Sequence, residues 1–212
     1  MNIQLVKTIY ILLGTISIGV ISSMTRIYTV TTLAKSSLKL ANFVDNKITF
    51  IGVIHHEISH ALLAFISGAK IVKVNLFNFN IKGGNLGSVV YYPRGPLVIQ
   101  LLQHSLAGLA PIICGSTTLA LIYKYMIVGN TFKDNIFWIG IVLLMQISYH
   151  MSLSKSDIKA AIIGIPILFI VIYILNTILV IDIEILMGFY KTILGILCIN
   201  IIITFILGLI LK

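Results

Sequence analysis

Long apolar runs, separated by short polar segments, make up most of this amino-acid sequence. Several of them approach or exceed the roughly 20 residues that a helix needs to cross a hydrocarbon core of about 30 Å. The run at 97–126 is too long for one straight span and contains Pro111, so we expect a broken helix there. The pattern predicts an all-α polytopic membrane protein, a single domain over residues 1–212 with about six transmembrane helices. The expected spans are 5–24, 48–67, 97–126, 135–151, 157–179 and 186–211.

Two segments depart from this pattern. Residues 26–47 mix basic side chains with Leu, Ala and Val, which is typical of a helix or loop that lies on a membrane surface. Residues 70–92 alternate apolar and polar positions with period two on either side of Gly83-Gly84. This alternation around a flexible dipeptide predicts a short β-hairpin after the second span.

The composition agrees with a membrane protein. Hydrophobic residues make up 58% of the chain and charged residues 10%, whereas soluble domains carry about 25% charged residues. A net charge of +9 would suggest nucleic acid as the partner of a soluble chain. Here the lipid bilayer with its anionic headgroups is the simpler partner, and we expect no nucleic acid. The Ile- and Lys-rich composition is typical of AT-rich bacterial genomes, so we expect an integral, multi-pass protein of a bacterial cell membrane.

The second span contains a motif with recognisable chemistry, His56-Glu57-Ile58-Ser59-His60. On a helix, His56 and His60 lie one turn apart on the same face, so both rings can reach one Zn²⁺ while Glu57 acts as a general base. With only 5 His in the chain, this pattern would arise by chance about once in a thousand such sequences. Ionisable groups at membrane depth are costly and usually face a bundle interior or a watery cavity. The motif therefore predicts a zinc site inside the membrane, in preference to a polar seam between helices.

A catalytic zinc site needs a third protein ligand and one open position. When the spans alternate, the second span ends on the same side as the polar turn 150–157, and the remaining acidic residues fall on the opposite side. Asp157 is therefore the leading candidate, and a helix N-cap is its alternative role. His150, in the same turn, could instead be the third ligand or could hold another ligand in place.

Two further side chains could contact the ligands or the substrate. Ser154 lies in the polar turn beside Asp157. His104 lies in the 97–126 region and could bond a substrate carbonyl, or could simply pack between helices. Neither residue has a spacing that decides its role.

Several of these features together resemble the site-2-protease-like intramembrane zinc metalloproteases. They are the stretch HHEISHALLAFISG at 55–68, the hairpin after it, LAGLAP at 106–111, and a late Asp in a polar turn. The resemblance covers about residues 48–165, and its most specific part is the HExxH motif. The family's usual Asn-Pro…Asp-Gly motif is absent, and Ser152-Leu-Ser-Lys-Ser-Asp157 stands in its place.

The resemblance implies a function and a role for each site residue. His56, His60 and Asp157 would bind zinc, and Glu57 would be the catalytic base for hydrolysis of a peptide bond by zinc-activated water. The substrate would be a membrane-embedded or membrane-tethered protein or peptide. The alternatives are a non-proteolytic membrane zinc-binding accessory protein and an ion-coupled transporter. Glu57 favours the hydrolase, because a site that only holds a metal has no need of a carboxylate between its two histidines.

Overall fold

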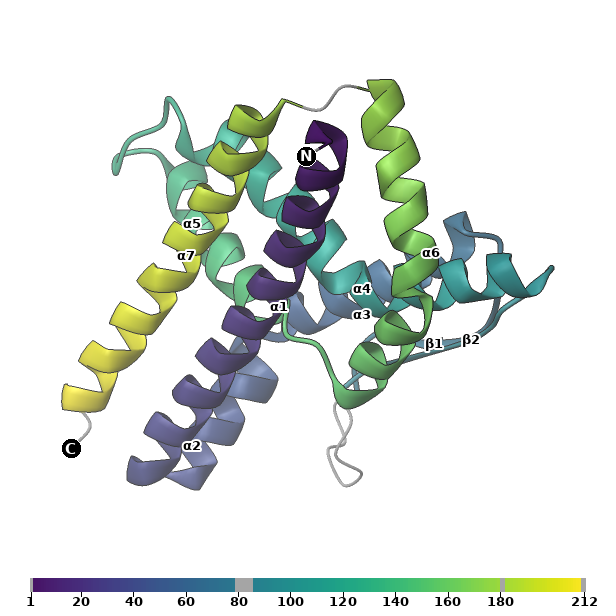
Figure 1. The fold of residues 1–212 in the computed structure, drawn as a ribbon. Coiled ribbons are helices and arrows are strands. Elements are labelled where there is room, and N and C mark those ends of the chain that lie inside the picture. Colours follow the sequence, from purple (N-terminus) through teal and green to yellow (C-terminus); the bar gives the residue numbers. More distant parts are fainter. Residues whose placement is uncertain (1, 79–85, 180–181, 211–212) are drawn as a thin grey trace.

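The computed structural model describes residues 2–78, 86–179 and 182–210, and most of them are helical (Figure 1). The chain forms seven α-helices, two π-helical segments (η1 and η3) and two short strands within these residues. In chain order they are α1 (Ile3–Ser36), α2 (Leu38–Phe43), η1 (Val44–Ile48), α3 (Phe50–Ile66), β1 (Lys70–Asn75), β2 (Ser88–Tyr92), α4 (Leu97–Ile122), η3 (Tyr123–Ile127), α5 (Asn135–Tyr149), α6 (Lys155–Leu179) and α7 (Ile183–Ile210).

Four of the described helices are long and apolar enough to cross a membrane: α1, α4 with η3, α6 and α7. A fifth span is reached if α2–η1 and α3, which meet at a bend of 52°, are counted as one. Helix α5 is apolar but has only 15 residues. The expectation of a helical chain with several potential spans and a small two-stranded sheet is confirmed. The expected number of six spans is not.

The first helix extends far beyond the expected span of 5–24. Helix α1 continues to Ser36, through the first part of the 26–47 segment that was expected to lie on the membrane surface. Arg26 lies inside α1, and its guanidinium donates two hydrogen bonds to the Asp45 carboxylate, each of 2.9 Å. Tyr149 donates a third hydrogen bond to the same carboxylate. Because the charge of Arg26 is neutralised within the bundle, the helix does not have to end there.

The expected break in the 97–126 region is absent, since α4 runs through Pro111 as one helix. Pro111 has no N–H and cannot donate to the carbonyl of Ala107, four residues earlier. The ring of His60 supplies the missing donor, because its Nδ1 lies 2.7 Å from the Ala107 oxygen. The helix therefore passes the proline without leaving that carbonyl unpaired in an apolar surrounding.

The two strands form an antiparallel pair, with Lys70 opposite Tyr92 and Asn75 opposite Ser88. The predicted hairpin is thus present in its strands, with an irregularity between Ile71 and Lys73. Its predicted Gly83-Gly84 turn lies outside the described residues.

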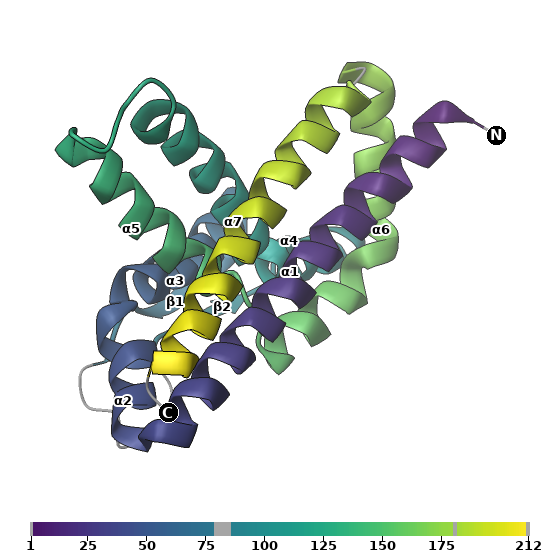
Figure 2. The ribbon, with the colours of Figure 1, turned by 90° about the vertical axis from the view of Figure 1, so that its left-hand side faces the viewer.

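Helix α4 crosses the middle of the molecule and packs closely on α6 (Figures 1 and 2). Glycine makes this approach possible: a Cβ at Gly108 would lie 2.6 Å from the backbone nitrogen of Ala161. Ser105 strengthens the contact by donating a hydrogen bond of 3.1 Å to the Ala161 carbonyl. Helices α1 and α7 lie side by side, joined by a 2.9 Å hydrogen bond between Thr29 and Thr204. The close contact between α4 and α6 fixes where α6 begins relative to α4.

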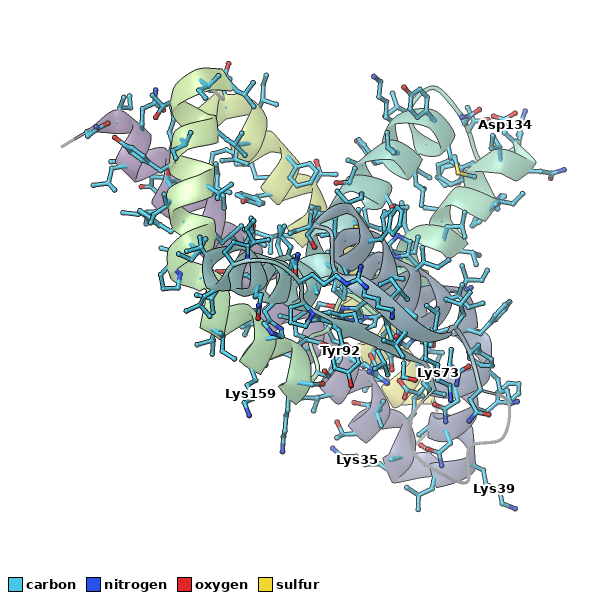
Figure 3. All side chains as sticks on the ribbon, turned by 90° about the vertical axis from the view of Figure 1, so that its right-hand side faces the viewer. Lys35, Lys39, Lys73, Tyr92, Asp134 and Lys159 are labelled. Atoms are coloured by element: carbon cyan, nitrogen blue, oxygen red, sulfur yellow. The ribbon has the colours of Figure 1, made fainter. Side chains whose placement is uncertain are left out.

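Four exposed lysines lie toward the same end of the molecule, away from the exposed Asp134 (Figure 3). We call one end the basic end; it carries Lys35, Lys39, Lys73 and Lys159, while Asp134 lies at the opposite end. Six alternating spans would have placed Lys35 and Lys159 on opposite sides of the membrane. The α2–η1 and α3 pair, bent by 52°, is not the straight second span that this alternation assumes.

Candidate metal centre and cavity

The two histidines of the HExxH motif and Asp157 come together where α3 meets the first turn of α6. The Nε2 atoms of His56 and His60 are 3.0 Å apart. Asp157 Oδ1 lies 3.5 Å from His60 Nε2, and its Oδ2 lies 3.9 Å from His56 Nε2. The ligand atoms that the three residues offer all lie within 4.8 Å of one another, so the group could hold a metal ion.

Both imidazole rings are held by backbone carbonyls. His56 Nδ1 lies 2.7 Å from the oxygen of His150, and His60 Nδ1 lies 2.7 Å from the oxygen of Ala107. A carbonyl can only accept, so each Nδ1 carries the hydrogen, and each neutral Nε2 presents a lone pair. The 3.0 Å between the two Nε2 atoms is therefore not a hydrogen bond in the neutral state, because neither atom has a hydrogen to donate. Two lone pairs that face each other beside a carboxylate repel one another, and a cation bound between them would remove this repulsion.

The spacing and chemistry of the group fit zinc. Tetrahedral ligands about 2.0–2.2 Å from a zinc ion lie roughly 3.3–3.6 Å from one another. The two Nε2 atoms are 3.0 Å apart, Asp157 Oδ1 lies 3.5 Å from His60 Nε2, and one ligand atom from each of the three residues lies within 4.8 Å of the others. Imidazole nitrogen with one carboxylate oxygen is a zinc-binding donor set, and a carbonyl partner at each Nδ1 is the usual outer support of such ligands.

Asp157 forms the helix cap that was its alternative role, and it also lies close to the two histidines. The Ser154 side chain accepts the Asp157 N–H at 3.2 Å, and Asp157 Oδ2 accepts the Ser154 N–H at 2.8 Å. This reciprocal capping box starts α6 and fixes the rotamer of Asp157. It uses only one carboxylate oxygen, so Oδ1 remains directed at His60. Ser154 therefore acts on the site through Asp157.

The His150 ring does not join the group, which removes it as the alternative third ligand. Its Nε2 lies 2.7 Å from the hydroxyl oxygen of Thr49, and the side chain is buried on that side. What His150 contributes is its backbone carbonyl, which is free to accept from His56 because α5 has ended at Tyr149. The neighbouring His55 also points elsewhere, with its Nε2 3.0 Å from the hydroxyl of Thr118.

Glu57 faces the same space from α3. Its side chain is buried, and its carboxylate accepts no hydrogen bond from any residue that the structure describes. Gly87, just before β2, lies directly against it: a Cβ at that position would be 2.8 Å from both Cδ and Oε1 of Glu57. The absence of a side chain at Gly87 therefore leaves the room that the carboxylate occupies.

A cavity of about 280 Å³ is lined by Glu57, the two motif histidines and Asp157. One wall comes from α3, another from α4 and the start of α6, and a third from the strand β2 and the residue before it. Its lining consists of His56, Glu57, His60, Gly87, Ser88, Val89, Tyr91, Ala107, Gly108, Ser154, Ser156, Asp157 and Ala160.

Tyr91 is a polar residue of this cavity that the sequence analysis missed. Its hydroxyl lies 3.2 Å from Nδ1 of His104, which explains where the second candidate histidine is directed. Burial, and then the negative charge of Asp157, raise the pKa of the Tyr91 phenol above its usual value, so the hydroxyl keeps its proton. The period-two alternation of 88–92 was a usable signal, because it places Tyr91 on the same face as Val89.

Comparison of the chain with protein-family models, curated proteins and solved structures finds no match.

Proposed function

We propose that this chain is an intramembrane zinc metalloprotease of the site-2-protease-like kind, which hydrolyses peptide bonds of membrane-embedded or membrane-tethered substrates. One observation supports this above all. The Glu57 carboxylate, which has no hydrogen-bond partner among the described residues, faces the same cavity as three residues that could hold a metal ion. A protein that only stores or carries a metal has no use for that carboxylate.

In this proposal His56, His60 and Asp157 hold the zinc ion. A zinc ion bound there would supply Lewis-acid chemistry, polarising the substrate carbonyl and lowering the pKa of a water molecule. Glu57 accepts a proton from the water as the water oxygen bonds to the carbonyl carbon. Glu57 then returns that proton to the amide nitrogen as the C–N bond breaks, so the carboxylate is regenerated.

The hairpin supplies a means of presenting the substrate. A transmembrane helix hides its peptide bonds in its own hydrogen bonds, so a substrate has to unwind before it can be cut. Strand β2 lines the cavity and, among the described residues, pairs only with β1. An extended segment of substrate pairs with the open edge of this sheet, which offers backbone donors and acceptors beside Glu57.

Metal content and cleavage, measured on the same purified samples, test the proposal. Wild-type protein in detergent or nanodiscs is expected to carry zinc and to cut a model transmembrane peptide. Glu57→Gln should retain the zinc and lose the cleavage, whereas His56→Asn should lose both. His55→Asn is the matched control, because His55 bonds Thr118 and should keep both properties. Equal cleavage by wild type and Glu57→Gln would refute the role of Glu57 and with it the proposed mechanism.

A further inference from the structure

Tyr91 occupies a distinct position in the cavity. Along β2 the side chains of Val89 and Tyr91 line the cavity, while Val90 and Tyr92 are 46% and 65% exposed. This alternation follows from the pleat of a strand, in which neighbouring side chains point to opposite faces. Tyr91 is the only phenol in the cavity lining, and none of the described residues there is a Lys, Arg, Asn or Gln.

The hydroxyl of Tyr91 is held from a second element. His104 lies on α4, three residues before Ala107, whose carbonyl anchors His60. The same helix therefore positions both a metal-binding histidine and the partner of Tyr91. The Tyr91 and His104 rings lie 5.9 Å apart between centroids, with 3.2 Å between the hydroxyl oxygen and Nδ1.

The direction of this hydrogen bond decides what Tyr91 can do. If the phenol donated to Nδ1, only oxygen lone pairs would remain for the cavity. If His104 is the tautomer with hydrogen on Nδ1, its ring donates to the phenol oxygen and the O–H is left to donate elsewhere. Hydrolysis of a peptide bond needs such a donor, because negative charge develops on the carbonyl oxygen as the water oxygen adds.

We infer that Tyr91 is a catalytic residue whose hydroxyl, oriented by His104, donates a hydrogen bond to the oxygen of the attacked carbonyl. No proton is transferred in this step, since the phenol keeps its hydrogen throughout. His104 is a positioning residue that acts only through Tyr91. The inference rests on the proposed function, because it assigns a role in that reaction.

Tyr91→Phe removes the hydroxyl and keeps the ring. Loss of one donor to a developing oxyanion typically costs 10²–10³ in kcat, so we expect kcat to fall about 100-fold with KM changed by less than about twofold. Zinc content and the unfolding temperature should match wild type. Tyr92→Phe is the matched control, because its side chain is exposed on the other face of the strand. It should leave kcat unchanged.

Binding gives a readout that does not depend on turnover. A phosphinate peptide mimics the tetrahedral carbon with a charged oxygen. We expect Tyr91→Phe to raise the Kd of this peptide by about the same factor by which it lowers kcat. The Kd of an uncut substrate peptide, measured with Glu57→Gln as background, should not change. At position 104, Asn can still donate from near the place of Nδ1 and should keep most of the activity. His104→Leu should match Tyr91→Phe.

The outcomes separate the two hypotheses. If zinc-loaded wild type and Tyr92→Phe cut the peptide and Tyr91→Phe cuts it equally fast, the inference about Tyr91 is wrong and the protease proposal stands. An equal loss of affinity for the phosphinate and for the uncut peptide would likewise overturn it, because Tyr91 would then bind the ground state. If zinc-loaded wild type cuts nothing, the proposed function itself fails.

Discussion

Replacement of Pro111 by Ala tests how the fold prepares the metal centre. Pro111 lacks an N–H, and the Ala107 carbonyl that this N–H would have bonded is instead 2.7 Å from His60 Nδ1. In Pro111→Ala a new N–H competes for that carbonyl and draws it back along the axis of α4. The ring of His60 then loses part of the contact that sets its tautomer and direction.

The variant should change metal affinity and stability in opposite directions. Loss of an outer partner of a metal-binding histidine costs 10–100-fold in affinity. A carbonyl has two lone pairs and can accept both donors, so we expect the lower value, about tenfold or ~1.4 kcal/mol. The helix itself gains, since proline in a helix interior costs about 3 kcal/mol relative to alanine. The metal-free variant should therefore unfold at a higher temperature than metal-free wild type.

The measurements are zinc titration against a competing chelator and thermal unfolding of the metal-free protein. Pro166→Ala is the control: this proline also lies inside a helix, and the carbonyl that it leaves free, that of Ile162, belongs to an exposed residue of α6. It should gain stability with unchanged zinc affinity. Wild-type zinc affinity in Pro111→Ala, or the same loss in Pro166→Ala, would refute the link between the proline and His60.

Three further predictions follow from close contacts and from charge. Gly108→Ala forces a methyl group against the backbone of α6; it should destabilise the fold by about 1–3 kcal/mol and weaken zinc binding, whereas Gly195→Ala, in open space, should do neither. Gly87→Ala should displace the general base, so that cleavage falls at least tenfold in a protein with full zinc content; unchanged cleavage would show that the loop yields instead. The basic end should face the cytoplasm. A cysteine at Asp134 should therefore be labelled from outside intact cells, whereas a cysteine at Lys35 should be labelled only from the inside.

Local spacing carried most of what the sequence could predict about the site. His56, Glu57 and His60 lie within two turns of one helix, so their common face needs no knowledge of the tertiary fold. Asp157 was found by following the alternation of spans, and the structure does bring it to the two histidines. The supports of the rings could not be predicted in this way, because the Ala107 carbonyl belongs to α4 and the His150 carbonyl to the turn after α5.

The number of spans was predicted less well for a related reason. Hydropathy identifies apolar runs but does not report where a helix bends or how far it continues past its apolar part. The ion pair of Arg26 with Asp45 lets α1 extend through a basic segment, and the chain bends by 52° before α3. Both features depend on contacts between elements, which the order of residues alone does not give.

Metal removal and reloading is the most direct test of peptide hydrolysis at this centre. Wild-type protein stripped with a chelator should lose cleavage of a membrane peptide and should regain it in proportion to added zinc, with a plateau at one ion per chain. Glu57→Gln should take up the same single ion and remain inactive throughout. Cleavage that survives complete removal of the metal, or a Glu57→Gln variant that regains activity with zinc, would contradict the account.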